Sequence, residues 1–112
     1  VMLHQKIRVG DGAILSGVSA FSEDVPPYVN AHKRNTVAGI NLIGMRRRNV
    51  PVESIAEVKR LYMAVYSGLS LRKNALKLLE EKAYSTPEGE KFLRFFAEPG
   101  RHFIHLARDK QR

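Results

Sequence analysis

The sequence has no cysteine among its 112 residues, and this absence removes three kinds of chemistry. Without cysteine a chain forms no disulfide, offers no thiolate to a metal ion and has no cysteine nucleophile. The absence also fits a reducing compartment, where disulfides are rare. Hydrophobic residues make up 44% of the chain, which is enough for a packed core and argues against wholesale disorder.

Long apolar runs are missing as well. No stretch approaches the roughly 20 apolar residues that a helix needs to cross a bilayer. The apolar stretch at the N-terminus, from Val1 to Leu3, is far too short for the hydrophobic part of a signal peptide. We therefore expect no membrane insertion.

The charge is strongly one-sided. Lys and Arg number 19 against 11 Asp and Glu, which gives a formal charge of +8. Such an excess favours anionic partners, although it also serves plain solubility. Aromatic residues are not interleaved with the basic ones and no groove-reading motif is present, so we expect no nucleic-acid partner.

A six-residue repeat runs through the first part of the chain. The apolar residues of one column are spaced by six, and a second column of small or aliphatic residues follows each of them by four positions. The first column is Leu3, Val9, Leu15 and Phe21, and the second is Ile7, Ala13, Ser19 and Val25.

Two columns in register predict a prism with three flat faces of short parallel strands. Six residues would make one side and one corner, so that every sixth residue points inward and stacks on the neighbouring coil. The alternative is a pair of ordinary short strands, Lys6–Val9 and Ala13–Leu15, in a mixed domain. Two matching columns favour the prism.

The repeat stops at the Asp-Val-Pro-Pro-Tyr-Val segment of residues 24–29, because consecutive prolines fix φ and donate no ladder hydrogen bonds. Residues 30–38 are polar and basic and are expected to form an exposed loop. From Gly39 the apolar spacing becomes helical, with further helices over about residues 51–66, after Ser70 and after the Ser-Thr-Pro-Glu signal of residues 85–88. We thus expect terminal repeat coils at 1–29, a loop at 30–38 and a helical domain at 39–112.

Three stretches together identify a family. They are His4-Gln5, the proline segment of residues 24–29, and the Gly-Ile-Asn-Leu-Ile-Gly-Met-Arg-Arg-Arg segment of residues 39–48. In these the chain resembles the C-terminal part of the bacterial UDP-N-acetylglucosamine O-acyltransferases that begin lipid A biosynthesis. The resemblance runs to about Ala97.

The resemblance implies a mixed fold, in which the last coils of a left-handed parallel β-helix precede a C-terminal α-helical bundle. It implies a cytoplasmic acyltransferase without a cofactor, which moves a 3-hydroxyacyl chain from acyl carrier protein to UDP-GlcNAc and is a homotrimer when full length. The family's general base is a His of an earlier coil, upstream of Val1, so we expect no catalytic residue in this chain and no activity from it alone. A non-catalytic basic module that binds acyl carrier protein or full-length subunits is the alternative.

The resemblance also assigns roles to individual residues. His4, Gln5, Asn41 and Arg47 match positions that contact the nucleotide-sugar, while Arg46 and Arg48 are candidates for contact with the acidic carrier protein. A guanidinium suits a diphosphate because it forms paired hydrogen bonds. Two departures weaken the match: Ile43 stands where the family often has an acidic residue, and the 30–38 segment is one residue shorter.

The remaining histidines, His32, His102 and His105, are expected at the surface. His102 and His105 have a helical spacing of three, but no carboxylate is placed to complete a metal site with them. We therefore expect no metal.

Overall fold

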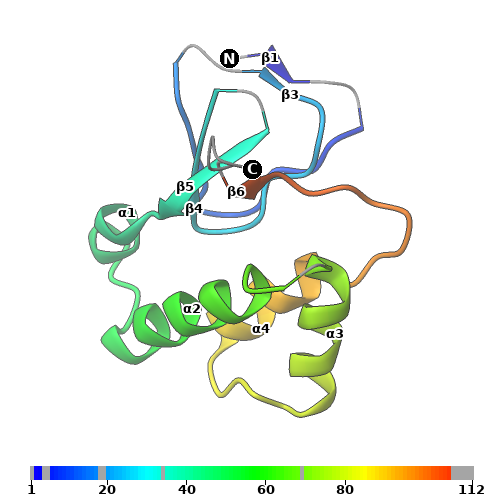
Figure 1. The fold of residues 1–112 in the computed structure, drawn as a ribbon. Coiled ribbons are helices and arrows are strands. Elements are labelled where there is room, and N and C mark those ends of the chain that lie inside the picture. Colours follow the sequence, from blue (N-terminus) through cyan, green and yellow to red (C-terminus); the bar gives the residue numbers. More distant parts are fainter. Residues whose placement is uncertain (1, 4–5, 18–19, 34, 69, 107–112) are drawn as a thin grey trace.

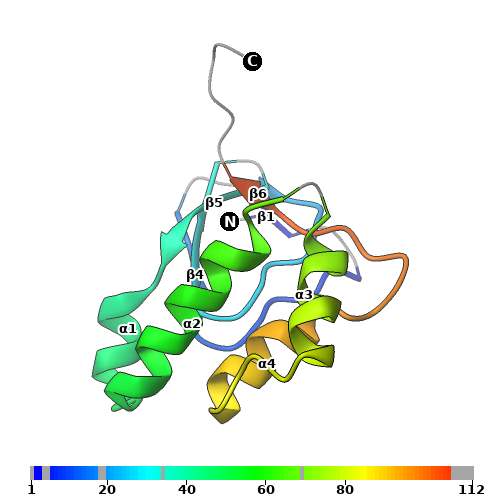
Figure 2. The same ribbon diagram turned by 60° about the horizontal axis from the view of Figure 1, so that its bottom comes forward.

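The computed structural model describes residues 2–3, 6–17, 20–33, 35–68 and 70–106. Short strands form one part of the molecule, and the helices between residues 52 and 95 lie together on one side of them (Figures 1 and 2). The strands are β1 (Met2–Leu3), β2 (Ile14–Leu15), β3 (Ala20–Phe21), β4 (Val29–His32), β5 (Thr36–Ile40) and β6 (His105–Leu106). The helices are α1 (Leu42–Arg47), α2 (Val52–Val65), α3 (Leu71–Glu80) and α4 (Pro87–Phe95).

The six-residue repeat produces parallel pairing between successive coils. Strand β1 pairs with β3 in parallel, and Leu3 lies opposite Phe21, a separation of 18 residues or three repeats. Burial increases along the first column, from Leu3 at 51% exposed and Val9 at 41% to Phe21 at 2%. This gradient is the one expected of stacked coils, because each inward side chain is covered by its neighbours.

The next turn of the chain is shorter by two residues. Val9 lies opposite Val25, and Leu15 opposite Ala31, each a separation of 16. The proline segment follows at this point, and its backbone lies so close to Gly10 that a Cβ there would be 2.3 Å from the nitrogen of Pro27. Glycine at position 10 therefore lets the rigid exit segment pack against the coil.

The described residues between positions 30 and 38 do not form the exposed loop that the polar composition of this segment predicts. They belong to an antiparallel hairpin of β4 and β5, in which Ala31 (1% exposed) and Val37 (2%) face the core. The turn is held by Asn35, whose Oδ1 accepts hydrogen bonds from the backbone N–H groups of Ser22 and Glu23. The prediction was wrong because Ala31 and Val37 alone do not give a recognisable strand periodicity. The hairpin is stabilised by β2 and β6, which pair with it on either side.

The first helix begins later than expected from Gly39. Gly39 and Ile40 end β5, and Asn41 is the N-cap of α1. The other helices agree closely with their sequence signals. Helix α2 runs between Pro51 and Tyr66, while Ser70 and Thr86 cap α3 and α4 by accepting hydrogen bonds from backbone N–H groups three residues later.

The residues after α4 form no helix where the structure describes them, up to position 106. Instead this segment returns to the strands: Phe103 pairs with Asp24, and β6 pairs in parallel with β5. The helical spacing of His102 and His105 therefore has no structural counterpart, although both side chains are exposed as expected. The 39–112 segment contributes to the sheet as well as to the helices.

A buried carboxylate fastens this segment to the coil. Asp24 is 3% exposed and receives the guanidinium groups of Arg8 and Arg101, each with its Nε 2.8 Å from Oδ2. Arg8 also donates to the carbonyl of Phe95 at the end of α4. Asp24 and its two arginines together thus join the coil, the last helix and the returning segment.

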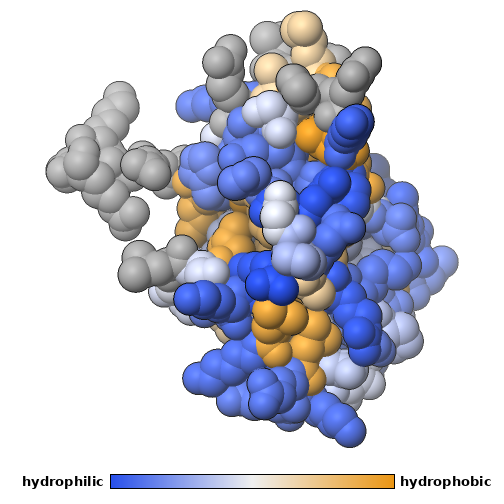
Figure 3. Space-filling view, turned by 90° about the vertical axis from the view of Figure 1, so that its right-hand side faces the viewer, coloured by the Kyte–Doolittle hydropathy of each residue, from blue (hydrophilic) through white to orange (hydrophobic). Residues whose placement is uncertain are grey.

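Charged and polar residues cover much of the face in Figure 3, with apolar residues showing as separate patches between them. Among the described residues, no helix combines the length and the apolar character required to cross a membrane.

Candidate functional site

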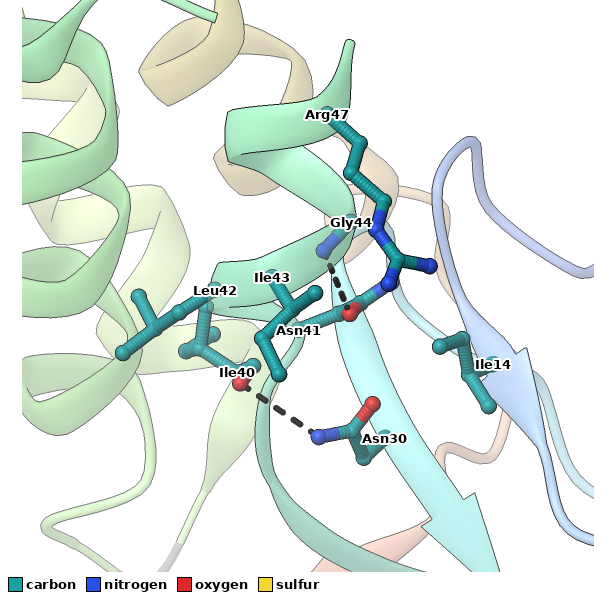
Figure 4. A pocket seen from close by; sticks show the side chains of 8 residues that line it. All are labelled: Ile14, Asn30, Ile40, Asn41, Leu42, Ile43, Gly44 and Arg47. Atoms are coloured by element: carbon teal, nitrogen blue, oxygen red, sulfur yellow. Dashed lines mark hydrogen bonds between the residues drawn. The ribbon is translucent and has the colours of Figure 1, made fainter.

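A pocket with a volume of about 550 Å³ lies where β5 meets α1. Its walls come from β2, β4, the end of β5 and the first turns of α1, as Figure 4 shows. The lining residues are Ile14, Asn30, Ile40, Asn41, Leu42, Ile43, Gly44 and Arg47. It therefore joins the repeat coils to the segment of residues 39–48.

Asn41 fixes the corner of this pocket. Its Oδ1 accepts a hydrogen bond from the backbone N–H of Gly44 at 3.0 Å, and its Nδ2 donates to the carbonyl of Gly12 at 3.0 Å. A Cβ on residue 44 would lie 2.3 Å from Nδ2 of Asn41, so the close approach depends on glycine. The amide thus caps α1 and ties it to the coil.

This geometry bears on the role predicted for Asn41. The residue lines the pocket, but it is 7% exposed and both ends of its amide already bind backbone groups. Positioning of α1 is the role that these contacts support. A direct contact with a ligand stays a prediction.

Arg47, the last residue of α1, also lines the pocket. Its side chain is exposed and extends from α1 toward Ile14, with the guanidinium beside the opening (Figure 4). Among the described residues, no carboxylate lies within 4.0 Å of it. The guanidinium is therefore available to an anion in the pocket.

Arg46 and Arg48 flank this residue and are exposed, and within the described ranges neither forms an ion pair with Asp or Glu. Arg48 extends to the corner of the coil, where its Nη1 would lie 3.3 Å from a Cβ on Gly12. The pKa of Asp11 at this corner is lowered, chiefly by its hydrogen bond from Lys91 and to a smaller extent by the charge of Arg48.

Two predicted residues, His4 and Gln5, lie outside the described residues. Ile43 is 63% exposed and belongs to the pocket wall, so an apolar side chain lines the pocket at the position where the resembled family often has an acidic residue. Sequence reasoning missed Ile14 and Asn30. Ile14 belongs to neither column of the six-residue repeat, and Asn30 lies in the segment that was predicted to be a loop.

The part of the chain that the structure describes contains no cluster of three or more His, Asp and Glu side chains suited to a metal ion.

Comparison with known proteins decides the family. The family model described as "Udp N-acetylglucosamine O-acyltransferase; Domain 2" matches residues 24–104. The chain belongs to the UDP-N-acetylglucosamine O-acyltransferase family. The match continues past Ala97, where the resemblance was expected to end, and it includes the returning segment up to Ile104.

Relatives within this acyltransferase family cover different lengths of the chain. An acyl-[acyl-carrier-protein]–UDP-N-acetylglucosamine O-acyltransferase from Sulfurovum sp. is 40% identical over 83 residues, which are 72% of this chain and 32% of the relative. The enzyme of that name from Paraburkholderia phymatum is 33% identical over 112 residues, or 98% of this chain and 40% of the relative. The chain thus spans 32–40% of the length of these acyltransferases.

Solved structures of the same acyltransferase family share the fold. The UDP-N-acetylglucosamine acyltransferase from Campylobacter jejuni superposes with a TM-score of 0.82 at 27% identity, covering 94% of this chain and 41% of that one. The acyltransferase from Bacteroides fragilis gives 0.80 at 35% identity, with 92% and 41% covered. The mixed arrangement of strands and helices is therefore that of these enzymes.

Proposed function

We propose that this chain supplies the C-terminal part of the substrate site of an acyltransferase that moves a 3-hydroxyacyl chain from acyl carrier protein to UDP-GlcNAc. The observation that carries the proposal is the guanidinium of Arg47, which has no carboxylate partner among the described residues and lies beside a pocket of about 550 Å³. Membership of the family and the names of its relatives, which specify both substrates, support it.

Arg47 is the group that would bind the diphosphate. A guanidinium offers two parallel N–H donors to phosphate oxygens, which gives orientation as well as attraction. Asn41 would act by holding α1 against the coil through its bonds to Gly44 and Gly12. His4 and Gln5 are proposed to contribute to the same site.

The chemical step would be performed elsewhere. None of the eight residues that line the pocket is His, Asp, Glu or Lys, so the pocket itself supplies no conventional general base. We propose that a His of another coil takes the proton from the sugar hydroxyl, and that this chain alone is inactive. An acyl transfer catalysed by the isolated chain would contradict this.

Acyl carrier protein is the proposed partner of Arg46 and Arg48. Their exposed cationic side chains at the end of α1 would attract an acidic protein surface. The main effect of this attraction would be a faster association of the two proteins. We further propose a left-handed coil, a homotrimer when the protein is full length, and a cytoplasmic location. The exposed charges of Arg46 and Arg48 also favour a second function, a non-catalytic module that binds carrier protein or full-length subunits.

The test of the nucleotide site is a binding titration with UDP. Exposed charge-assisted hydrogen bonds contribute about 1 kcal/mol, so Arg47→Met should weaken UDP binding roughly fivefold to tenfold. Lys73→Met, which removes one positive charge from the exposed face of α3, is the matched control and should change the affinity less than twofold. Equal effects of the two substitutions would show that only net charge matters, and the proposed site would be wrong.

A further inference from the structure

Asn30 lies in the wall of the pocket, on the strand that faces α1. It is opposite Ile14 on β2 and opposite Gly39 on β5. Residues directly opposite each other in a sheet project to the same face, so Asn30 shares the pocket side of the sheet with Ile14. Figure 4 shows the Asn30 side chain between Ile14 and Ile40, below the guanidinium of Arg47.

An irregularity in the hairpin occurs beside this residue. The pairing passes from Asn30 opposite Gly39 directly to Ala31 opposite Val37, so that Ala38 has no partner in the ladder. Gly39 has a φ of +136°, which residues with a side chain rarely adopt. A β-bulge of this kind re-aims neighbouring groups and is common next to binding sites.

The bulge brings the carbonyl of Ile40 within reach of the Asn30 amide. Nδ2 of Asn30 donates to this carbonyl in a long hydrogen bond of 3.4 Å. A carbonyl oxygen can only accept, so the NH₂ end of the amide must face it. The Oδ1 atom is consequently directed toward the pocket opening, as Figure 4 shows.

The Oδ1 atom of Asn30 differs from most of the pocket lining because it is a polar atom with no hydrogen bond to the backbone of the described residues. Ile14, Ile40, Leu42 and Ile43 present apolar side chains, and the amide of Asn41 is used in capping α1. Among these eight described lining residues, Arg47 and Asn30 are thus the two with side-chain polar groups free for a ligand. One offers positive donors and the other a neutral acceptor.

We propose that Asn30 is a specificity-determining residue of this site. Its Oδ1 accepts a hydrogen bond from a hydroxyl or N–H group of the ligand, beside the apolar wall of the pocket. Arg47 binds the anionic group of the substrates that occupy the same pocket. This inference rests on the proposed function and adds a determinant to it. A uridine nucleotide and a 3-hydroxyacyl group each carry such a donor, and the experiment separates the two.

The experiment measures binding of three probes to the 112-residue chain by titration calorimetry. The probes are UDP, 3-hydroxydodecanoyl-pantetheine and dodecanoyl-pantetheine, and the last two differ only in the hydroxyl. Asn30→Leu removes the acceptor at similar size. Asn74→Leu is the matched control, because its amide also donates to a backbone carbonyl, that of Val65 at 2.8 Å, between α2 and α3 and away from the pocket.

Loss of one neutral hydrogen bond should weaken the affected probe about fivefold to tenfold in Asn30→Leu, with Asn74→Leu near the wild-type affinity. A loss confined to UDP identifies the nucleotide as the donor, and a loss confined to the hydroxylated thioester identifies the acyl group. If the wild type binds a probe and Asn30→Leu binds each probe equally well, the role of Asn30 is refuted while the proposed function stands. If the wild type binds none of the three probes, both the role of Asn30 and the proposed function are refuted.

Discussion

Replacement of the buried carboxylate of Asp24 should lower the stability of the fold. It is 3% exposed and receives four side-chain or backbone hydrogen bonds from Arg8 and Arg101 that are 2.8 or 2.9 Å long. Asp24→Asn keeps the shape of the side chain and removes its charge. Two guanidinium groups would then lose their buried counterion and keep only the exposed carboxylate of Glu98, at 4.0 Å from Arg8 and 3.3 Å from Arg101.

The expected loss follows from the burial of the partners. Removal of one member of a buried ion pair costs about 3–5 kcal/mol. Arg8 and Arg101 are 34% and 25% exposed, so water can partly solvate them after the change, and we expect about 2–4 kcal/mol. In urea this corresponds to a shift of the unfolding midpoint by roughly 1–3 M.

The same substitution should change the acid stability. Burial alone would raise the pKa of Asp24, but the hydrogen bonds from Arg101 and Arg8 outweigh it and hold the pKa below its usual value. A carboxyl group with a lowered folded-state pKa stabilises the protein above its unfolded pKa, and this contribution disappears as the pH falls through the folded value. The wild type should therefore lose stability below about pH 4 more steeply than Asp24→Asn.

Asp11→Asn is the control for this reasoning. Asp11 also forms an ion pair of 2.8 Å, with Lys91, but its side chain is 67% exposed. Exposed pairs contribute about 0–1 kcal/mol because water and salt screen them. If urea unfolding gave the same loss for Asp11→Asn and Asp24→Asn, burial would not govern the strength of these pairs, and the argument for Asp24 would be wrong.

Two further changes test the packing around the helices. Gly44→Ala places a Cβ 2.3 Å from Nδ2 of Asn41. The melting temperature should therefore fall and UDP binding should weaken. Helix propensity alone predicts a higher melting temperature for alanine, and that result would contradict the role of Gly44. Glu57→Gln exchanges a 7% exposed acceptor of the Thr86 N–H for an amide that has only one acceptor oxygen, and chemical unfolding should show a loss of about 1–3 kcal/mol. Glu53→Gln in the first turn of the same helix is its exposed control, and an equal loss there would exclude a specific role for Glu57.

Several features of this protein were determined by short stretches of sequence. The caps Ser70 and Thr86 were predictable because an N-cap hydrogen bond closes within three residues. The opposition of Leu3 and Phe21 followed from the six-residue repeat, because a regular column requires only that each coil resemble the last. Arg47 was identified from the motif that contains it, and the structure brings it to the pocket.

Contacts between distant segments decided the rest. The hairpin of residues 30–38 needs β2 on one side and β6 on the other, and β6 comes from beyond the last helix. One of the two arginine partners of Asp24, Arg101, is 77 residues away, a distance over which no periodicity operates. Asn30 has the appearance of an ordinary loop residue until the bulge turns its amide toward the pocket. A strand, a buried ion pair and a pocket wall each depend on a second segment, and only tertiary structure supplies that segment.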